Sequence, residues 1–302
     1  MSIKDCRILV TGPAGQIAFP LAARLARDNE VWGIARFGDA AARDRVEQTG
    51  ITTRAVDLAA PDWSGLPEHF DYVLHLAAQI PPGLDYDATL RTNAEGTGHL
   101  MRRFRSARAC LVMSTCGVYA PPADPHHAVR ETDPLGVSLQ PYSPTYCVSK
   151  IAQEAVARFA AGAYGLPTVI ARMNAAYGDN GGLPPIPLEM ILADQPIALG
   201  PGRAPIAIPI PQDDFFAQTP ALLAAAASPG PIPNWGDQAT VEVRSTSGLL
   251  APQGGSTAGI RERAYGPDHR AGLARARETR SRIHRGSSTI RMWAQPCIRR
   301  TK

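Results

Sequence analysis

Short apolar segments typical of strands alternate with segments of helical period along residues 7–172. The first is R-I-L-V-T, residues 7–11, which Gly12 ends, and Ile17, Leu21 and Leu25 then recur at the spacing of one helix face. Further strands are predicted over residues 31–35, 51–56, 72–77, 109–114 and 167–172, with helices up to residue 50, around 88–106 and around 145–164. Strands that alternate with helices pair in parallel, so we predict an α/β fold with a doubly wound parallel sheet.

The turn after the first predicted strand reads T-G-P-A-G-Q-I-A, residues 11–18. Glycine at positions 12 and 15 lets the backbone turn tightly and lets a pyrophosphate approach, and the helix that follows offers free N–H groups. A tight turn of this kind also occurs without a ligand, but its place after the first of several alternating strands favours a Rossmann dinucleotide site. We therefore predict that Gly12, Gly15, Gln16 and Ile17 contact a dinucleotide cofactor.

The end of the second predicted strand bears on the choice of cofactor. A Rossmann site for NAD usually places an acid there, on the ribose hydroxyls, whereas this chain has Ala35 and Arg36. Without a carboxylate a 2′-phosphate is not repelled, and Arg36 can pair with it. We favour NADP over NAD on this ground; the alternative is that Arg36 is a solvated surface charge.

The run P-Y-S-P-T-Y-C-V-S-K, residues 141–150, places Tyr146 four residues before Lys150. On a helix that begins near Pro144 the two side chains share a face. A free phenol has a pKa of about 10, and a nearby ammonium lowers the pKa of a phenol, so that it can serve as a base for a substrate hydroxyl. The same spacing also occurs where a tyrosine packs on a lysine stem, so other motifs must decide.

Seven stretches together carry a family resemblance: T-G-P-A-G-Q-I-A (11–18), V-D-L (56–58), H-L-A-A (75–78), T-N-A-E-G-T (92–97), M-S-T-C-G-V-Y (113–119), Y-C-V-S-K (146–150) and R-M-N-A-A-Y-G (172–178). With these motifs in this order, residues 5–240 resemble the extended short-chain dehydrogenase/reductase family, the NAD-dependent epimerase/dehydratase group. The resemblance implies an enzyme, an NAD(P)-dependent oxidoreductase or epimerase, with a Rossmann domain and a small, possibly incomplete, C-terminal substrate lobe.

The resemblance also implies roles for individual residues. Tyr146 would be the base, Lys150 would lower its pKa and hold the cofactor ribose, and Thr115 would orient the substrate oxygen. Asn174 falls where the family commonly contacts substrate. The other implied cofactor contacts are Asp57 and Leu58 beside the adenine, Ala77 and Ala78 under the fourth strand, and Asn93 on the helix behind the nicotinamide.

Departures from the family pattern narrow the expected reaction. Members that dehydrate sugars carry acids directly after the catalytic threonine, where this chain has Cys116 and Gly117. We therefore expect hydride transfer at a secondary alcohol or ketone, as oxidation, reduction or transient-oxidation epimerisation. We interpret Cys116 as a small buried filler, although a thiol can also protonate a carbon. The arginines that grip a nucleotide diphosphate in many relatives have no clear counterpart except Arg203, so the substrate is expected to be a sugar or a nucleotide-sugar-like molecule.

The expected domains are a Rossmann domain over residues 1–177, substrate-lobe segments interleaved with returning Rossmann elements over 178–240, and a basic tail over 241–302. Asp213 and Asp214 are expected to cap the helix that follows them. The tail holds twelve Arg and one Lys against four acids, a net charge of +9, whereas residues 1–240 sum to −5. Its lack of an apolar stripe is typical of a poorly ordered segment; a basic arm for nucleic acid or anionic membrane and a shifted reading frame are the alternatives.

The longest apolar stretch, A-L-L-A-A-A-A from residue 221, is too short to cross a bilayer, and the first ten residues do not have the pattern of a signal peptide. Five dispersed cysteines without a C-x-x-C pair argue against a zinc site or a disulfide framework. We expect a cytoplasmic protein without metal or membrane, with a small-molecule substrate and a homodimeric state, and we do not expect nucleic acid. The alternative function is a catalytically impaired cofactor-binding or interaction protein with a basic C-terminal arm, against which the intact Thr115, Tyr146 and Lys150 speak.

Overall fold

The computed structural model describes residues 3–124, 127–136, 143–182, 206–207, 209–236 and 241–242. All of them lie in the first of the chain's two units, Met1–Thr246. The predictions for Arg203 and for the tail beyond residue 242 fall outside the described residues. No helix in the described ranges is both long enough and apolar enough to pass through a membrane.

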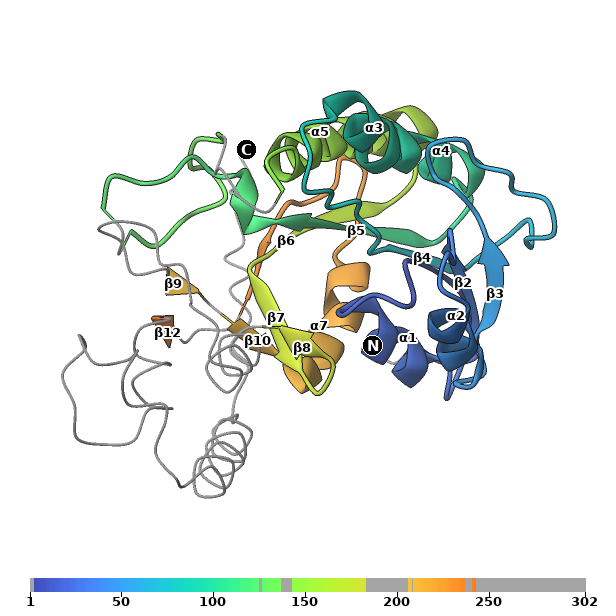
Figure 1. Cartoon of the computed structure of the whole chain (residues 1–302). Helices are drawn as coiled ribbons and strands as arrows, with labels where there is room; N and C mark the ends of the chain where they lie inside the picture. Colours follow the sequence, from blue (N-terminus) through green and yellow to red (C-terminus); the bar gives the residue numbers. More distant parts are fainter. Residues whose placement is uncertain are drawn as a thin grey trace, which may run out of the picture. The chain divides into compact units, whose positions relative to one another are not determined.

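A seven-stranded sheet forms the centre of the unit, in the order β11-β6-β5-β4-β1-β2-β3 (Figure 1). Every pair of neighbours is parallel. The strands are β1 Arg7–Thr11, β2 Glu30–Ala35, β3 Thr52–Ala55, β4 Tyr72–His75, β5 Ala109–Thr115, β6 Thr168–Met173 and β11 Asn234–Trp235. The order reverses between β1 and β4, which makes the carboxyl edge beside β1 the expected ligand crevice. The predicted doubly wound α/β fold is confirmed.

Helices cover both faces of the sheet (Figure 1). They are α1 Ala18–Leu25, α2 Ala40–Glu47, α3 Tyr86–Leu90, α4 Gly96–Arg103, α5 Tyr146–Tyr164 and α7 Gln212–Ala224. Helices α3, α4 and α5 lie on one face, and α1, α2 and α7 lie on the other. The helix predicted around 88–106 is divided, because the π-helical turn η1, Arg91–Glu95, joins α3 to α4; a second short turn, the 3-10 helix η2, Cys116–Val118, follows β5.

Strand side chains alternate between two hydrophobic cores, one on each face of the sheet. In β1, Ile8 and Val10 belong to the core under α1 and α7, whereas Leu9 belongs to the core under α4 and α5. In β5, Leu111 and Val112 are divided in the same way. This period of two is what places apolar runs between two helical layers.

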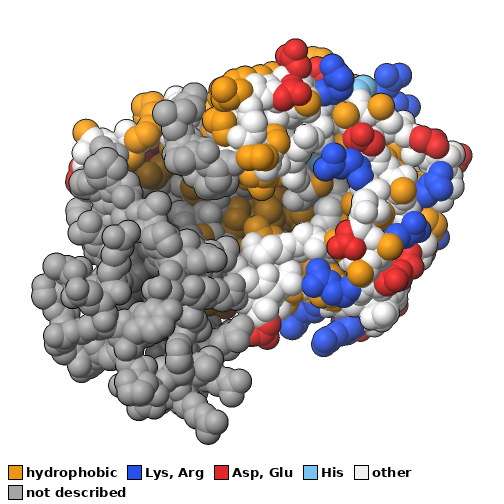
Figure 2. All heavy atoms as spheres, viewed as in Figure 1, with side chains coloured by type: hydrophobic (Ala, Val, Ile, Leu, Met, Phe, Trp, Pro, Cys, Tyr) orange, Lys and Arg blue, Asp and Glu red, His pale blue; other side chains and the backbone are white. Residues whose placement is uncertain are grey.

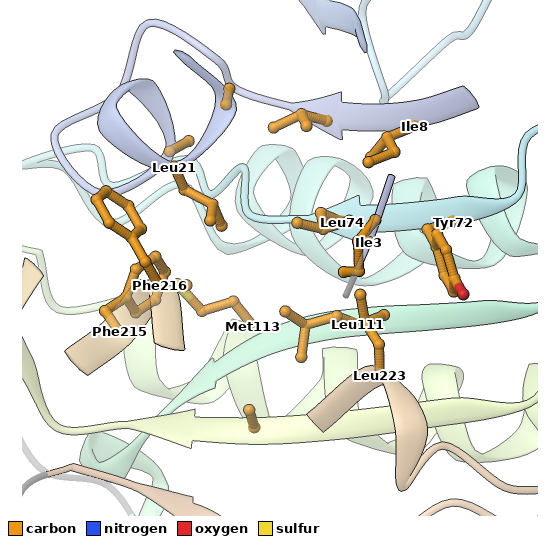
Figure 3. Close-up of a cluster of buried hydrophobic side chains, with 14 of the residues drawn as sticks. Ile3, Ile8, Leu21, Tyr72, Leu74, Leu111, Met113, Phe215, Phe216 and Leu223 are labelled. Atoms are coloured by element: carbon orange, nitrogen blue, oxygen red, sulfur yellow. The ribbon is translucent and has the colours of Figure 1, made fainter. Parts of the chain in front are cut away.

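The segment that returns to the sheet after residue 208 closes the first core. Phe215 of α7 stacks on Trp235 of β11 with ring centroids 4.5 Å apart. Figure 3 shows Phe215 and Phe216 reaching toward Leu21 of α1 and Met113 of β5. The two-residue strand β11 lies at the edge of the sheet, next to β6.

The predicted cap of α7 is wrong. The helix begins at Gln212 with Pro211 at the N-cap, and no side chain caps it. Asp213 and Asp214 lie in the first turn instead, two and three positions after the N-cap residue. Carboxylates in that turn still lie near the positive end of the helix dipole.

Two small sheets include strands of the region expected to form the substrate lobe, residues 178–240, and strands that flank it. The strands β7 Ala175–Gly178 and β8 Gly181–Gly182 form an antiparallel hairpin, and β10 Pro209–Pro211 pairs with β7 in parallel. The strands β9 Ile206–Ala207 and β12 Val241–Glu242 pair antiparallel. Residues 183–205, 208 and 237–240 of this region lie outside the described ranges.

Candidate active site

The glycine turn connects β1 to α1 at the carboxyl edge of the sheet. Gly12 has φ +67°, and a Cβ on it would lie 3.1 Å from the Cα of Ala77, in the loop after β4. The N–H of Gly12 donates to the Ile34 carbonyl (2.8 Å), and that of Gly15 donates to the Gly12 carbonyl (2.9 Å). Glycine is needed at position 12 because the backbone is left-handed there and a neighbouring chain passes close by.

Helix α1 opens directly behind this turn. Ile17 is its N-cap residue, and no side chain makes a capping hydrogen bond. The first turn of a helix presents N–H groups that lack partners within the helix, together with the positive end of the dipole. A close glycine turn followed by a helix start without a side-chain cap fits the pyrophosphate of a dinucleotide.

Gln16 joins the glycine turn to the β7–β8 hairpin. Its side-chain Nε2 donates to the Ala176 carbonyl (3.2 Å), and its backbone carbonyl accepts a hydrogen bond from Asn180 Nδ2 (2.8 Å). A Cβ on Gly182 would lie 2.8 Å from Gln16 Nε2. This contact joins residues about 160 positions apart, so no local pattern predicts it.

The other residues predicted to contact the cofactor follow β2, β3 and β4 at the same edge. Arg36 and Asp57 are exposed, and Asp57 accepts a hydrogen bond from the Ala59 N–H (3.0 Å). Leu58 is buried against α4, since a Cβ on Gly96 would lie 2.9 Å from its Cβ. Ala78 follows Ala77 and is half-buried.

Asn93 of η1 is buried, and its amide is bonded within the protein. Its Oδ1 accepts from the Gln79 N–H (2.7 Å), and its Nδ2 donates to the Gln79 carbonyl (2.9 Å) and to Ser149 Oγ (2.9 Å). The side chain thus ties the loop after β4 to α5. A direct contact of Asn93 with the cofactor stays a prediction.

Tyr146 and Lys150 lie one turn apart at the start of α5. Tyr146 is the first residue of the helix and is half-buried. Lys150 is 1% exposed, and its Nζ lies 5.8 Å from the centroid of the Tyr146 ring. Burial lowers the pKa of Lys150 to about 7, although the Glu154 carboxylate acts in the opposite direction. The side chains of Tyr146 and Lys150 therefore lie close together, with the Lys150 amine buried next to the phenol ring.

Thr115 and Asn174 lie at the ends of the two strands nearest this pair. Thr115 ends β5, and its Oγ1 accepts from the Gly117 N–H (3.1 Å). It pairs in register with Met173, so that Asn174 follows at the same level. A Cβ on Gly117 would lie 3.1 Å from Sγ of Cys147, the residue after Tyr146, so the end of β5 packs directly on the start of α5.

Cys116 lies beside these residues with its thiol directed into the protein. The Sγ–H donates to the Arg172 carbonyl (3.2 Å), and burial raises the pKa of Cys116 to about 12. A thiol with that pKa stays protonated at neutral pH, and the residue as a whole is half-buried. Within the described residues, no group of three His, Cys, Asp or Glu side chains could hold a metal ion.

Two buried residues that follow Lys150 on α5 were not predicted. Glu154 accepts from Arg172 of β6 at both carboxylate oxygens (2.9 and 2.7 Å) and from the Ser114 hydroxyl of β5 (2.6 Å). Gln153 Oε1 accepts from Lys150 Nζ (2.8 Å). Both residues stand three or four positions after Lys150, so the helical period could have placed them on the same face.

The surface of the molecule is hollowed between α5 and the β7–β8 hairpin (Figure 2). Figure 2 shows a hollow between the surface over α5 and the surface over β7 and β8, with hydrophobic side chains at its floor. A second hollow, of about 770 Å³, is lined by Arg7, Glu30, Asp71 and Arg108, among others, at the amino ends of β1, β2, β4 and β5. Since the catalytic candidates lie at the carboxyl ends, the second hollow is not the site described here.

Comparison with solved structures agrees with the fold. Similar solved structures include the UDP-glucuronic acid 4-epimerase from Bacillus cereus, in complex with UDP-glucuronic acid and NAD (TM-score 0.68, 22% identity, covering 80% of this chain and 81% of that one). The UDP-N-acetylglucosamine 4-epimerase from Methanobrevibacter ruminantium M1 has a TM-score of 0.69 at 18% identity and covers 94% of this chain and 100% of that one. The UDP-glucose 4-epimerase from Thermotoga maritima has a TM-score of 0.63 at 20% identity and covers 80% of this chain and 81% of that one. At these identities the likeness concerns the fold.

No curated protein matches the chain in sequence. The NAD dependent epimerase/dehydratase family matches it over residues 8–199, which include the glycine turn, Thr115, Tyr146, Lys150 and Asn174. This range is more than half of the chain. The protein is therefore an enzyme that belongs to the NAD dependent epimerase/dehydratase family.

Proposed function

We propose that the enzyme epimerises a carbinol carbon of a nucleotide sugar by transient oxidation and reduction. The observation that carries this proposal is that Lys150 is buried with its Nζ 5.8 Å from the centroid of the Tyr146 ring. The start of their helix, α5, packs on the residues that follow Thr115, at the same edge of the sheet as the glycine turn. The similar structures named above are 4-epimerases of UDP-sugars, which supports a nucleotide sugar as the substrate class.

Tyr146 is the base of the proposed reaction. The charge of Lys150 favours the phenolate, and a fall of two to three units in the phenol pKa corresponds to about 3–4 kcal/mol. Thr115 accepts a hydrogen bond from the Gly117 N–H, so its own hydrogen is available to the substrate oxygen. Asn174, level with Thr115 on the neighbouring strand, contacts the sugar. When bound, the nicotinamide supplies a reversible hydride acceptor.

The cofactor is held by the residues of the carboxyl edge. Gly12, Gly15, Gln16 and Ile17 hold the pyrophosphate, Lys150 holds the ribose hydroxyls, and the remaining contacts are those predicted for Asp57, Leu58, Ala77, Ala78, Asn93 and Tyr146. These assignments are supported by the placement of the loops after β1, β3 and β4 at one edge of the sheet.

We propose NADP rather than NAD as the preferred form. Asp39 is the first acid after β2, and its carboxylate accepts the N–H groups of Ala41 (3.0 Å) and Ala42 (3.3 Å) as the N-cap of α2. It is thus occupied with the helix start. Arg36 is exposed at the end of β2, where it can pair with a 2′-phosphate. The similar structures whose descriptions name a dinucleotide contain NAD, so this preference sets the chain apart from them.

The remaining predictions concern the whole protein. We propose a cytoplasmic homodimer that pairs through α4 and α5, where Phe159 is 71% exposed. We also propose the domain limits 1–177, 178–240 and 241–302.

The test of the proposed function is the variant Tyr146→Phe, which removes only the phenol hydroxyl. Purified protein is incubated with NADP or NAD and with UDP-glucose, UDP-N-acetylglucosamine or UDP-glucuronic acid, and the epimer is followed by proton NMR. Tyr146→Phe should lower kcat by 10² or more, since it removes the acid–base group. The dissociation constant of the cofactor should hardly change.

Tyr164→Phe is the matched control, because Tyr164 ends the same helix and packs on the core far from the site. It should turn over at the rate of the unmodified protein. Turnover by Tyr146→Phe at that rate, or conversion of none of the three sugars, would overturn the proposal.

A further inference from the structure

Lys150 makes two hydrogen bonds from a site without solvent access. Its Nζ donates to the Met113 carbonyl of β5 (2.8 Å) and to Gln153 Oε1 of α5 (2.8 Å). Burial disfavours the charged form of an amine, so the hydrogen-bond acceptors around Lys150 decide what fraction of it stays protonated. The Met113 carbonyl is fixed in a strand, whereas a glutamine can present either an acceptor or a donor.

Thr97 of α4 sets the orientation of Gln153. The Thr97 hydroxyl donates its only hydrogen to the Asn93 carbonyl (2.7 Å), so it can only accept from other groups. Gln153 Nε2 donates to this oxygen (3.0 Å). The amide must then turn its Oε1 toward Lys150, and a flipped amide would lose the bond to Thr97 and place N–H groups against the cation.

His75 of β4 completes the chain of hydrogen bonds. Because Thr97 can only accept, His75 Nε2 carries the hydrogen of that contact (2.7 Å). His75 Nδ1 then accepts from the Thr11 hydroxyl (2.8 Å), whose oxygen accepts the N–H groups of Leu76 (3.0 Å) and Ala77 (2.9 Å). The donors therefore converge on Thr97: Thr11 and His75 donate toward it from the end of β1, and Lys150 and Gln153 donate toward it from α5.

The structure assigns to Gln153 the role of a positioning residue: oriented by Thr97 and His75, its Oε1 keeps Lys150 charged and aimed beside Tyr146. This inference rests on the proposed function, in which the charge of Lys150 makes Tyr146 a base.

Other ionisable groups near Lys150 do not replace this acceptor. Glu154 of α5 is paired at both oxygens with Arg172 of β6, and burial lowers the pKa of His75 to about 3, which keeps it neutral. Tyr146 lies one turn before Lys150, and the thiols of Cys116 and Cys147 have raised pKa values that keep them neutral as well. Among the described residues, the two direct acceptors from Lys150 Nζ are therefore Met113 and Gln153.

The test reads Lys150 directly and needs no substrate. The chain has three lysines, Lys4, Lys150 and Lys302, so protein labelled with ¹³C-lysine gives three side-chain signals, and Lys150→Met identifies the one of interest. Its pKa is measured by NMR titration of the full-length protein without ligand. Gln153→Met should lower the Lys150 pKa by about one unit, a tenfold change in its protonation equilibrium. Gln153→Glu should raise it, because a carboxylate accepts and adds negative charge.

Two further variants separate orientation from general damage. Thr97→Val removes the oxygen that orients the amide and should lower the Lys150 pKa, even if Gln153→Met does not fold. Gln48→Met makes the same chemical change at the exposed end of α2 and should leave the pKa unchanged. A Lys150 pKa that is the same in unmodified protein, Gln153→Met and Thr97→Val would overturn the inference.

The catalytic consequence gives a second readout. In Gln153→Met the phenol of Tyr146 loses part of the stabilisation of its anion, so the acid limb of the kcat/KM profile should move to higher pH. If no substrate is converted at all, the proposed function fails, whereas the lysine titration still decides the role of Gln153.

Discussion

His75 is completely buried and hydrogen-bonded at both ring nitrogens, to Thr11 and Thr97. Burial lowers its pKa from 6.5 to about 3, and the positive charge of Lys150 adds to this. A proton on Nδ1 would meet a Thr11 oxygen that already accepts two backbone N–H groups. His75 thus belongs to the chain of hydrogen bonds that joins Thr11, at the start of the glycine turn, to Lys150. Its lowered pKa makes the stability of the fold sensitive to acid.

The acid sensitivity of His75 can be measured. Between pH 6.5 and 3 the unfolded chain binds a proton at residue 75 and the folded chain does not, so the free energy of unfolding falls as the pH falls, by up to about 1.4 kcal/mol per pH unit. Relative to His75→Gln, the unmodified protein should lose about 2 kcal/mol between pH 7 and pH 5, as measured by urea unfolding.

His69→Gln is the control for this measurement, because His69 is an exposed histidine. Its stability should follow that of the unmodified protein over the same range. Parallel curves for the unmodified protein and His75→Gln would mean that folding leaves the pKa of His75 at its ordinary value.

At the scale of elements, α5 organises the site. The period of the sequence predicts that Tyr146 and Lys150 share a face, and the structure has them one turn apart. The residues that contact this face of α5 come from β4, β5, β6 and α4. The spacing of residues along one helix contains no information about which residues of other elements they meet. Gln153 and Glu154 were overlooked for this reason, since a buried polar side chain becomes informative only when its partners are known.

The turns show the same division between local and distant information. The glycine turn was predicted because its cause is local, a tight backbone path between a strand and a helix. The contact of Gln16 with the β7–β8 hairpin depends on the path of a segment far along the chain. The break in the helix around residue 93 was missed because it depends on distant partners: the π turn lies where Asn93 bonds Gln79 and Ser149.

Two helical glycines give a matched test of element packing. Gly96 begins α4, and a Cβ on it would lie 2.9 Å from both the Cβ and the backbone oxygen of Leu58. Gly162 lies in α5 with no heavy atom within 4 Å of such a Cβ. Gly96→Ala should destabilise the protein by about 1–3 kcal/mol, because the strain acts on backbone. Gly162→Ala should stabilise it by about 0.5–1 kcal/mol.

Urea unfolding of the two variants checks this expectation. Opposite signs for the same chemical change in the two helices would show that α4 packs on the loop after β3 at the distance described. A stabilising Gly96→Ala would place α4 farther from Leu58.

At the scale of the whole unit, the fold separates stability from chemistry. Both hydrophobic cores lie against the faces of the sheet, while the candidate catalytic residues and the glycine turn lie at its carboxyl edge. The segment that returns after residue 208 adds α7 to the first core and β11 to the sheet, next to β6. A ligand that binds along the edge therefore touches loops from several strands at once, and it should stabilise the unit as a whole.

Cofactor binding should consequently appear as a rise in Tm. At a ligand concentration of 100 times the dissociation constant the stabilisation is about 2.7 kcal/mol, which corresponds to roughly 5–10 °C for a unit of this size. NADP should raise Tm more than an equal concentration of NAD, because Arg36 is exposed at the end of β2 and can pair with the 2′-phosphate.

Arg36→Glu should reverse that order, because a carboxylate repels the 2′-phosphate and accepts hydrogen bonds from the ribose hydroxyls of NAD. Arg27→Glu makes the same change of charge at an exposed position after α1 and should keep the order of the unmodified protein. If NAD gives the larger rise in both the unmodified protein and Arg36→Glu, Arg36 is a solvated surface charge and the cofactor is NAD. The Tm of the whole unit thereby decides the role of the Arg36 side chain, because a ligand bound at the carboxyl edge stabilises all its loops and shifts one common unfolding transition.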